Sequence, residues 1–170
     1  ALIAPWNAPT ALASMKVAAA LAFGNTCVLK PSEQTPLALR RFVELLHEAG
    51  LPEGVVNLVN GRGSVTGEAL VAHRGVDLVS FTGGTETGRR IMTGAAQRLK
   101  PCSLELGGKS ANVIFASADL DRALDAALLA IFSGNGQQCL AGSRILLEKS
   151  ISEAFLARFV DRARQLRIGD

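Results

Sequence analysis

The sequence predicts an α/β fold in which a doubly wound parallel sheet is followed by the start of a second α/β domain. Two observations predict this fold class. Short runs of apolar and β-branched residues alternate along the chain with helical stretches, and Gly, Pro or Asn residues separate them. The composition, 48% hydrophobic and 19% charged, also suits parallel strands that are buried on both faces.

The first hundred residues show this alternation most regularly. Pro36 suits the first turn of a helix, and Gly50 followed by Pro52 suits the end of one. Repeats of strand, helix and strand at this spacing imply right-handed crossovers between parallel strands. We expect strands at residues 1–4, 26–29, 55–59 and 77–81, and helices at residues 10–23, 37–49, 64–73 and 85–99.

The pattern starts anew after Lys100 and Pro101, and we place a domain boundary near Gly107. Residues 1–107 then form the first domain, and residues 108–170 begin the second. A helix at residues 119–132 carries Leu120, Ala123, Leu124, Ala127, Leu128 and Ile131 on one face. We also expect strands at residues 102–106, 112–115 and 143–147, a Gly-rich loop at residues 134–142, and a last helix that runs to residue 170.

The charge distribution argues against a nucleic-acid partner. The net charge of +3 comes from Lys and Arg spread along the chain. Its densest basic group, Arg158, Arg162, Arg164 and Arg167, is interrupted by Asp161, which is typical of a solvent-exposed helix face. No apolar run reaches the roughly 18 residues that a membrane-spanning helix needs. We therefore expect neither nucleic acid nor membrane as a partner.

The cysteines favour a reducing compartment, which we take to be the cytoplasm. Cys27, Cys102 and Cys139 are far apart, and only His47 and His73 could join them in a metal site. An odd number of cysteines at such spacings predicts neither a disulfide framework nor a zinc site.

Polar or glycine-containing segments follow the first four predicted strands, at residues 5–7, 30–33, 60–63 and 82–84. Ligands of open α/β sheets bind at the carboxyl ends of the strands. Glu33 could bond a ribose 2′-hydroxyl and repel a 2′-phosphate, although a carboxylate at a helix entry is an equally good interpretation. Lys30 could donate to the same ribose.

Two glycine-bearing turns could hold phosphate groups. Backbone N–H groups of residues 82–88, at the start of a helix, could bind a pyrophosphate oxygen. Residues 61–67 superficially match a dinucleotide-binding fingerprint, but a tight strand-to-helix turn would use the same glycines. Neither turn decides the function alone.

Two residues are out of place in a purely structural reading. Cys139 lies in a loop of glycines and amides, where a thiol should be accessible, whereas Cys27 within a strand fits a buried apolar role. Glu105 lies between two leucines in a strand-like run, ahead of two glycines. A carboxylate buried there would be suited to act as a general base.

Five segments together resemble the ordered signature of the aldehyde dehydrogenase superfamily. They are Pro-Trp-Asn at residues 5–7, Lys-Pro-Ser-Glu at 30–33, Phe-Thr-Gly-Gly at 81–84, Glu-Leu-Gly-Gly-Lys at 105–109 and Gly-Gln-Gln-Cys at 136–139. The resemblance covers the whole chain. It implies that residues 1–107 are part of an incomplete Rossmann-like NAD-binding domain and that residues 108–170 begin the catalytic domain.

The resemblance implies a chemical role for three residues. The Cys139 thiolate would attack an aldehyde, and the Asn7 side-chain amide and the Cys139 backbone N–H would hold the oxyanion. Glu105 would activate the water that hydrolyses the resulting thioester. The resemblance also implies a nicotinamide cofactor, and the position of Glu33 favours NAD over NADP. The cofactor contacts would be Ile3, Ala4, Trp6, Lys30, Ser32, Glu33, Gly63, Gly67, Phe81, Thr82, Gly83, Gly84, Thr87, Leu106 and Gly107.

The resemblance further implies that the chain is a fragment, because relatives carry further N-terminal and C-terminal portions. It also implies that the full-length enzyme is a homo-oligomer, a dimer or tetramer. Two alternatives stay open. A nucleotide-binding module without chemistry would leave Cys139 and Glu105 without a role. A cysteine-dependent esterase or acyltransferase would use the same thiol without hydride transfer.

Overall fold

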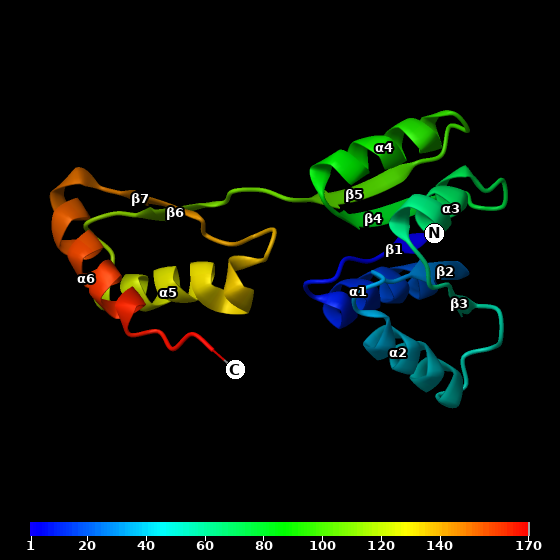
Figure 1. The fold of residues 1–170 in the computed structure, drawn as a ribbon, viewed down its shortest axis with the longest axis horizontal. Coiled ribbons are helices and arrows are strands. Elements are labelled where there is room, and N and C mark those ends of the chain that lie inside the picture. The colour runs from blue at the N-terminus through cyan, green and yellow to red at the C-terminus, as the bar shows by residue number, and fades with distance from the viewer. Residues whose placement is uncertain (170) are drawn as a thin grey trace. The chain divides into compact units, whose positions relative to one another are not determined.

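The computed structural model of the chain describes residues 1–169 and divides into two compact units (Figure 1). The first unit is Ala1–Leu106, and the second begins at Gly107. In the first unit, five parallel strands form one sheet in the order β3-β2-β1-β4-β5. The strands are β1 (Leu2–Ile3), β2 (Cys27–Lys30), β3 (Val56–Leu58), β4 (Val79–Gly83) and β5 (Cys102–Leu106).

Helices cover both faces of this sheet, which confirms the doubly wound fold. Leu2 of β1 belongs to a buried cluster with residues of α1 (Pro9–Ala22) and α2 (Pro36–Glu48). Its neighbour Ile3 belongs to a second cluster with residues of α3 (Glu68–Ala72) and α4 (Thr85–Ala96). Successive side chains of a strand point to opposite faces, so β1 is buried on both sides.

Local sequence explains the limits of α2. Pro36 occupies its first turn, where the missing N–H costs nothing. After the helix, Gly50 adopts a φ of 93° and donates its N–H to His47 O, while Leu51 N–H bonds Leu46 O. This pair of bonds is a Schellman motif, which requires a left-handed residue that glycine supplies.

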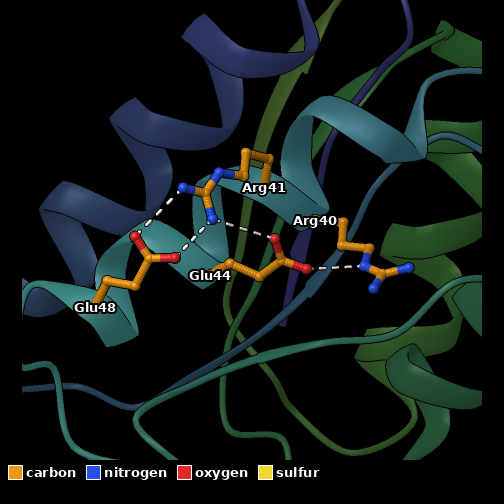
Figure 2. Close-up of polar contacts among 4 residues, drawn as sticks. All are labelled: Arg40, Arg41, Glu44 and Glu48. Carbon is orange, nitrogen blue, oxygen red and sulfur yellow. Dashed lines mark hydrogen bonds and ion pairs between the residues drawn. The ribbon is translucent and has the colours of Figure 1, made fainter.

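The exposed face of α2 carries a connected group of charges (Figure 2). Arg41 binds Glu48 through both of its terminal nitrogens and also lies 3.5 Å from Glu44, which pairs with Arg40 at 2.9 Å. Exposed pairs of this kind contribute little to stability, because water screens their charges. The group therefore leaves its charges satisfied.

Three predicted elements of the first unit differ clearly in the structure. The helix expected at residues 85–99 ends at Ala96. The helix expected at residues 64–73 begins as a π-helical turn, Gly63–Gly67, in which the N–H groups of residues 65–67 converge on Arg62 O. The strand expected at residues 77–81 begins at Val79 and continues to Gly83, because β4 pairs with β5 as far as Leu106. Thr82 and Gly83 are therefore strand residues.

The second unit contains two parallel strands, β6 (Ala111–Ile114) and β7 (Arg144–Leu147), joined through α5 (Leu120–Phe132). The Asp119 carboxylate caps α5 by accepting bonds from the N–H groups of Asp121 and Arg122. Its core contains Ile114, Leu124, Ala127, Leu128 and Phe155, and Leu120 and Ala123 pack against it partly buried. Of the predicted apolar face of α5, only Ile131 lies outside this cluster.

The last helix, α6 (Ser152–Arg164), packs its basic residues against α5. Arg158 pairs with Asp121, and Arg162 pairs with Asp125. The expectation that this helix runs to residue 170 was wrong, because it ends at Arg164 and Ile168 beyond it is fully exposed. Residues without an apolar contact gain too little to remain helical. Residue 170 lies outside the described residues.

Within residues 1–169, no helix is both long enough and apolar enough to cross a membrane.

Candidate active site

The carboxyl edge of the five-stranded sheet collects most of the predicted site residues. The chain leaves β1 toward β2 on one side, and β4 lies on the other side of β1. This reversal of strand order is the place where open α/β sheets bind nucleotides. Residues 4–7 leave β1 there, and residues 84–87 leave β4 beside them.

A buried ammonium group lies at the end of β2. Lys30 is only 2% exposed, and its Nζ donates to Pro31 O at 2.9 Å and lies 3.8 Å from the Glu33 carboxylate. Burial lowers the pKa of Lys30, and the attraction of Glu33 acts in the opposite direction. Gly67 approaches the Lys30 stem, since a Cβ at Gly67 would lie 3.9 Å from it. Glu33 itself is exposed.

The turn from β4 into α4 presents unsatisfied polar groups. Thr82 is 6% exposed, and its Oγ1 has no hydrogen-bond partner among the described residues. Gly84 precedes the first turn of α4, whose N–H groups at residues 85–87 have no partner within the helix. Gly88 lets α4 lie close to β5, because a Cβ there would meet Leu106 Cδ2 at 2.6 Å. Such an edge suits an anionic ligand.

Glu105 lies near the end of β5, opposite Thr82 in the register. The expectation that its side chain is buried was wrong: Glu105 is exposed. Strand alternation explains this, because Leu104 and Leu106 pack against the cluster beside α4 while Glu105 points to the opposite face of an edge strand. Solvent can therefore reach its carboxylate.

The sequence reasoning missed Lys16 of α1. Its Nζ donates to Ser80 Oγ at 2.7 Å, and the Glu105 carboxylate attracts its charge. Burial nevertheless lowers the pKa of Lys16. The available signal was that Lys16 is the one charged residue of α1. The structure thus places an ammonium group beside the candidate general base.

Cys139 lies in the loop between α5 and β7 of the second unit, and its side chain is exposed as predicted. Its backbone N–H makes no hydrogen bond to any of residues 1–169. Neighbouring residues hold the loop, through bonds from Ala141 N–H to Gln138 O and from Gly142 N–H to Ala130 O. Cys27 is buried, and Cys102 is partly buried.

The backbone before Cys139 depends on glycine. Gly136 has a φ of 69°, and a Cβ there would lie 2.9 Å from Ile131 O, a backbone atom that cannot rotate away. We expect Gly136→Ala to destabilise the loop by about 1–3 kcal/mol and to change the iodoacetamide labelling rate of Cys139. Thermal unfolding and labelling kinetics measure the two effects.

Gly24→Ala is the matched control for this substitution. Gly24 has a similar φ of 70°, but a Cβ there would have no atom within 4 Å. The difference between the two variants isolates the overlap with Ile131 O. Equal destabilisation by both variants would contradict the assigned role of Gly136.

The other predicted residues divide between the two units. Asn7 and Trp6 are exposed beyond β1, whereas Ile3 and Ala4 are buried. Phe81 packs in the core beside α4. Within residues 1–169, no group of three or more His, Cys, Asp or Glu side chains could hold a metal ion. Ser32, Gly63, Gly83 and Thr87 lie at the carboxyl edge of the first sheet, and Gly107 and Cys139 belong to the second unit.

Comparison with known families decides what this combination of residues represents. The model of the aldehyde dehydrogenase family matches residues 1–170. The chain belongs to this family. It is 51% identical over 168 residues to the betaine aldehyde dehydrogenase of Bacillus subtilis (strain 168), covering 99% of this chain and 34% of that protein. It is 55% identical over 170 residues to the 5-carboxymethyl-2-hydroxymuconate semialdehyde dehydrogenase of Escherichia coli, covering 100% and 36%.

Solved structures of family members share this fold. HpcC from Thermus thermophilus superposes with a TM-score of 0.95 at 54% identity, over 99% of this chain and 33% of that chain. PnpE in complex with nicotinamide adenine dinucleotide gives a TM-score of 0.96 at 50% identity, over 99% and 35%. The chain therefore spans about a third of the length of the aldehyde dehydrogenases that it matches.

Proposed function

We propose that the chain is the central part of an NAD-dependent aldehyde dehydrogenase that oxidises an aldehyde to a carboxylic acid through a thioester on Cys139. The observation that carries the proposal is the exposed Cys139 thiol, in a glycine-supported loop, with its own backbone N–H unbonded among residues 1–169. An accessible thiol beside a free N–H donor suits attack on a carbonyl group.

The carboxyl edge of the first unit fits a dinucleotide. Thr82 Oγ1 is a buried polar atom without a partner in residues 1–169, and the N–H groups at the start of α4 offer donors for a pyrophosphate. Lys30 and Glu33 offer a donor and an acceptor for ribose hydroxyls. Gly67 leaves space next to Lys30. A bound NAD supplies the acceptor for the hydride that leaves the substrate carbon.

Cys139 performs the first step of the proposed reaction. Its thiolate sulfur forms a bond to the aldehyde carbon, and the carbonyl electron pair moves onto oxygen. The Asn7 side-chain amide and the Cys139 backbone N–H stabilise the negative oxygen by donating hydrogen bonds. Loss of hydride from the same carbon converts this adduct into an acyl thioester on Cys139.

Glu105 serves in hydrolysis of the thioester. Its carboxylate takes a proton from water while the water oxygen attacks the acyl carbon, and the Cys139 thiolate leaves. The exposure of Glu105 is consistent with access to water. Lys16 of α1 lies near enough for its ammonium group to be attracted by the Glu105 carboxylate.

A hydride-transfer assay tests the proposal. The whole protein, supplied with NAD and an aldehyde such as betaine aldehyde or a semialdehyde, should form NADH in proportion to the acid produced. Ester hydrolysis without NADH formation for any aldehyde would favour a cysteine esterase or acyltransferase instead. If the protein binds NAD but shows neither turnover nor labelling of Cys139, a nucleotide-binding module is favoured.

Glu33 should set the preference for NAD over NADP. A carboxylate close to a 2′-phosphate costs on the order of 1 kcal/mol, which corresponds to about a 5- to 10-fold preference in kcat/KM. Glu33→Gln should narrow that preference. Glu53→Gln removes the same charge from an exposed turn and should leave it unchanged. Equal efficiency with both cofactors in the unsubstituted enzyme would refute this role of Glu33.

We further propose a homo-oligomeric enzyme located in the cytoplasm. The three cysteines are free thiols, which suits a reducing compartment. The proposed domain roles follow the two units: the first is part of the NAD-binding domain and the second begins the catalytic domain.

A further inference from the structure

A polar pocket, half open to solvent, lies at the edge of the first sheet opposite the candidate cofactor site; it is called the cavity below. Its lining residues come just before β4 and β5 in the chain, and these strands begin at Val79 and Cys102. The cavity therefore lies at the amino ends of the two strands. A ligand held there would be separate from one bound at the carboxyl ends. The cavity has a volume of about 310 Å³ and is lined by Arg74, Val76, Asp77, Arg98, Leu99 and Lys100.

The backbone fixes one cation of this cavity. Lys100 Nζ donates to Val71 O at 2.8 Å and to His73 O at 2.6 Å, at the end of α3. Leu99 adopts a left-handed φ of 54°, so the chain turns sharply between α4 and Lys100. The Leu99 side chain is 92% exposed and therefore does not fill the cavity.

The guanidinium groups of two lining arginines have unused hydrogen-bond donors. Arg74 and Arg98 are exposed, and neither guanidinium has a hydrogen-bond or ion-pair partner among residues 1–169. Other arginines of the first unit, such as Arg40 and Arg41, are paired with carboxylates. Guanidinium groups bind the oxygens of phosphates and carboxylates through two parallel hydrogen bonds.

We propose that this cavity binds a small multivalent oxyanion, through the guanidinium groups of Arg74 and Arg98 and the positive charge of Lys100. The volume falls at the lower end of the range for small-molecule sites. Asp77 opposes binding of a bare anion, although its carboxylate can accept a hydrogen bond from a hydroxyl group of the ligand. The proposal does not depend on aldehyde oxidation.

Titration calorimetry on the whole protein tests this site with inorganic phosphate and, separately, with citrate. Arg74→Gln and Arg98→Gln should each weaken binding about 10-fold, since a hydrogen bond to a charged group is lost. Asp77→Asn should tighten binding, because it removes a negative charge that repels the anion. A misfolded variant would lose affinity, so a gain in affinity cannot result from misfolding. Arg40→Gln removes the same charge from α2 and should leave the affinity unchanged, because Arg40 pairs with Glu44 and does not line the cavity.

Saturating NAD separates this cavity from the candidate pyrophosphate site. Phosphate bound at the amino edge should retain its affinity when NAD is present, whereas phosphate bound beside α4 should be displaced. Comparison of the two affinities shows whether the cavity prefers a phosphate group or a carboxylate ligand. Failure of both anions to bind, loss of binding with NAD, or unchanged affinity in both arginine variants would overturn the proposal.

Discussion

Cys139→Ala should abolish the dehydrogenase activity of the whole enzyme, with kcat falling at least about 10⁴-fold. The substitution removes the only atom that can bond the aldehyde carbon in the proposed mechanism, so no thioester forms. Steady-state NADH formation measures the loss. Hydrolysis of activated esters should be lost in parallel, because it requires the same sulfur.

The other two cysteines are the matched controls. Cys27 is buried in the sheet, and Cys102 is partly buried at the start of β5. Burial raises the pKa of both thiols, which keeps them protonated and unreactive at neutral pH. Cys27→Ala and Cys102→Ala should therefore alter stability while keeping activity. Substantial turnover by Cys139→Ala would remove the central claim of the proposed function.

Residues 1–170 alone should show no steady NADH formation with any aldehyde. The second unit contributes two strands, and one face of this small sheet exposes Val113, Phe115 and Leu146 at 54%, 62% and 50%. Exposed apolar faces and unpaired strand edges favour aggregation over a well-ordered site. A shift of about 1 Å in the reacting groups can lower a rate roughly 100-fold.

The whole enzyme assayed at the same concentration is the reference for this prediction. Iodoacetamide labelling of Cys139 should still occur in the isolated segment, since the thiol is exposed. Labelling without turnover would show that the chemistry needs more than residues 1–170. Saturable aldehyde oxidation by residues 1–170 would show that this segment contains the complete catalytic machinery.

Much of the fold could be predicted from local sequence. Pro36 and Gly50 marked the ends of α2, and the apolar spacing from Leu120 to Leu128 marked the buried face of α5. The limits of β4 could not be predicted this way. They depend on pairing of Thr82 with Glu105 across two strands, and such a register is a tertiary property.

Local sequence also predicted the exposure of Cys139, because its thiol lies in a loop rich in glycines and amides and not within an apolar strand. The tertiary structure alone decided the surroundings of Glu105. Its flanking leucines indicated burial, but the strand order places β5 at the edge and turns the carboxylate toward solvent. The same packing brings Lys16 of α1 to Ser80, 64 positions away in the chain. Distant contacts of this kind leave no periodic pattern in a single sequence, because they arise when helices and strands pack together.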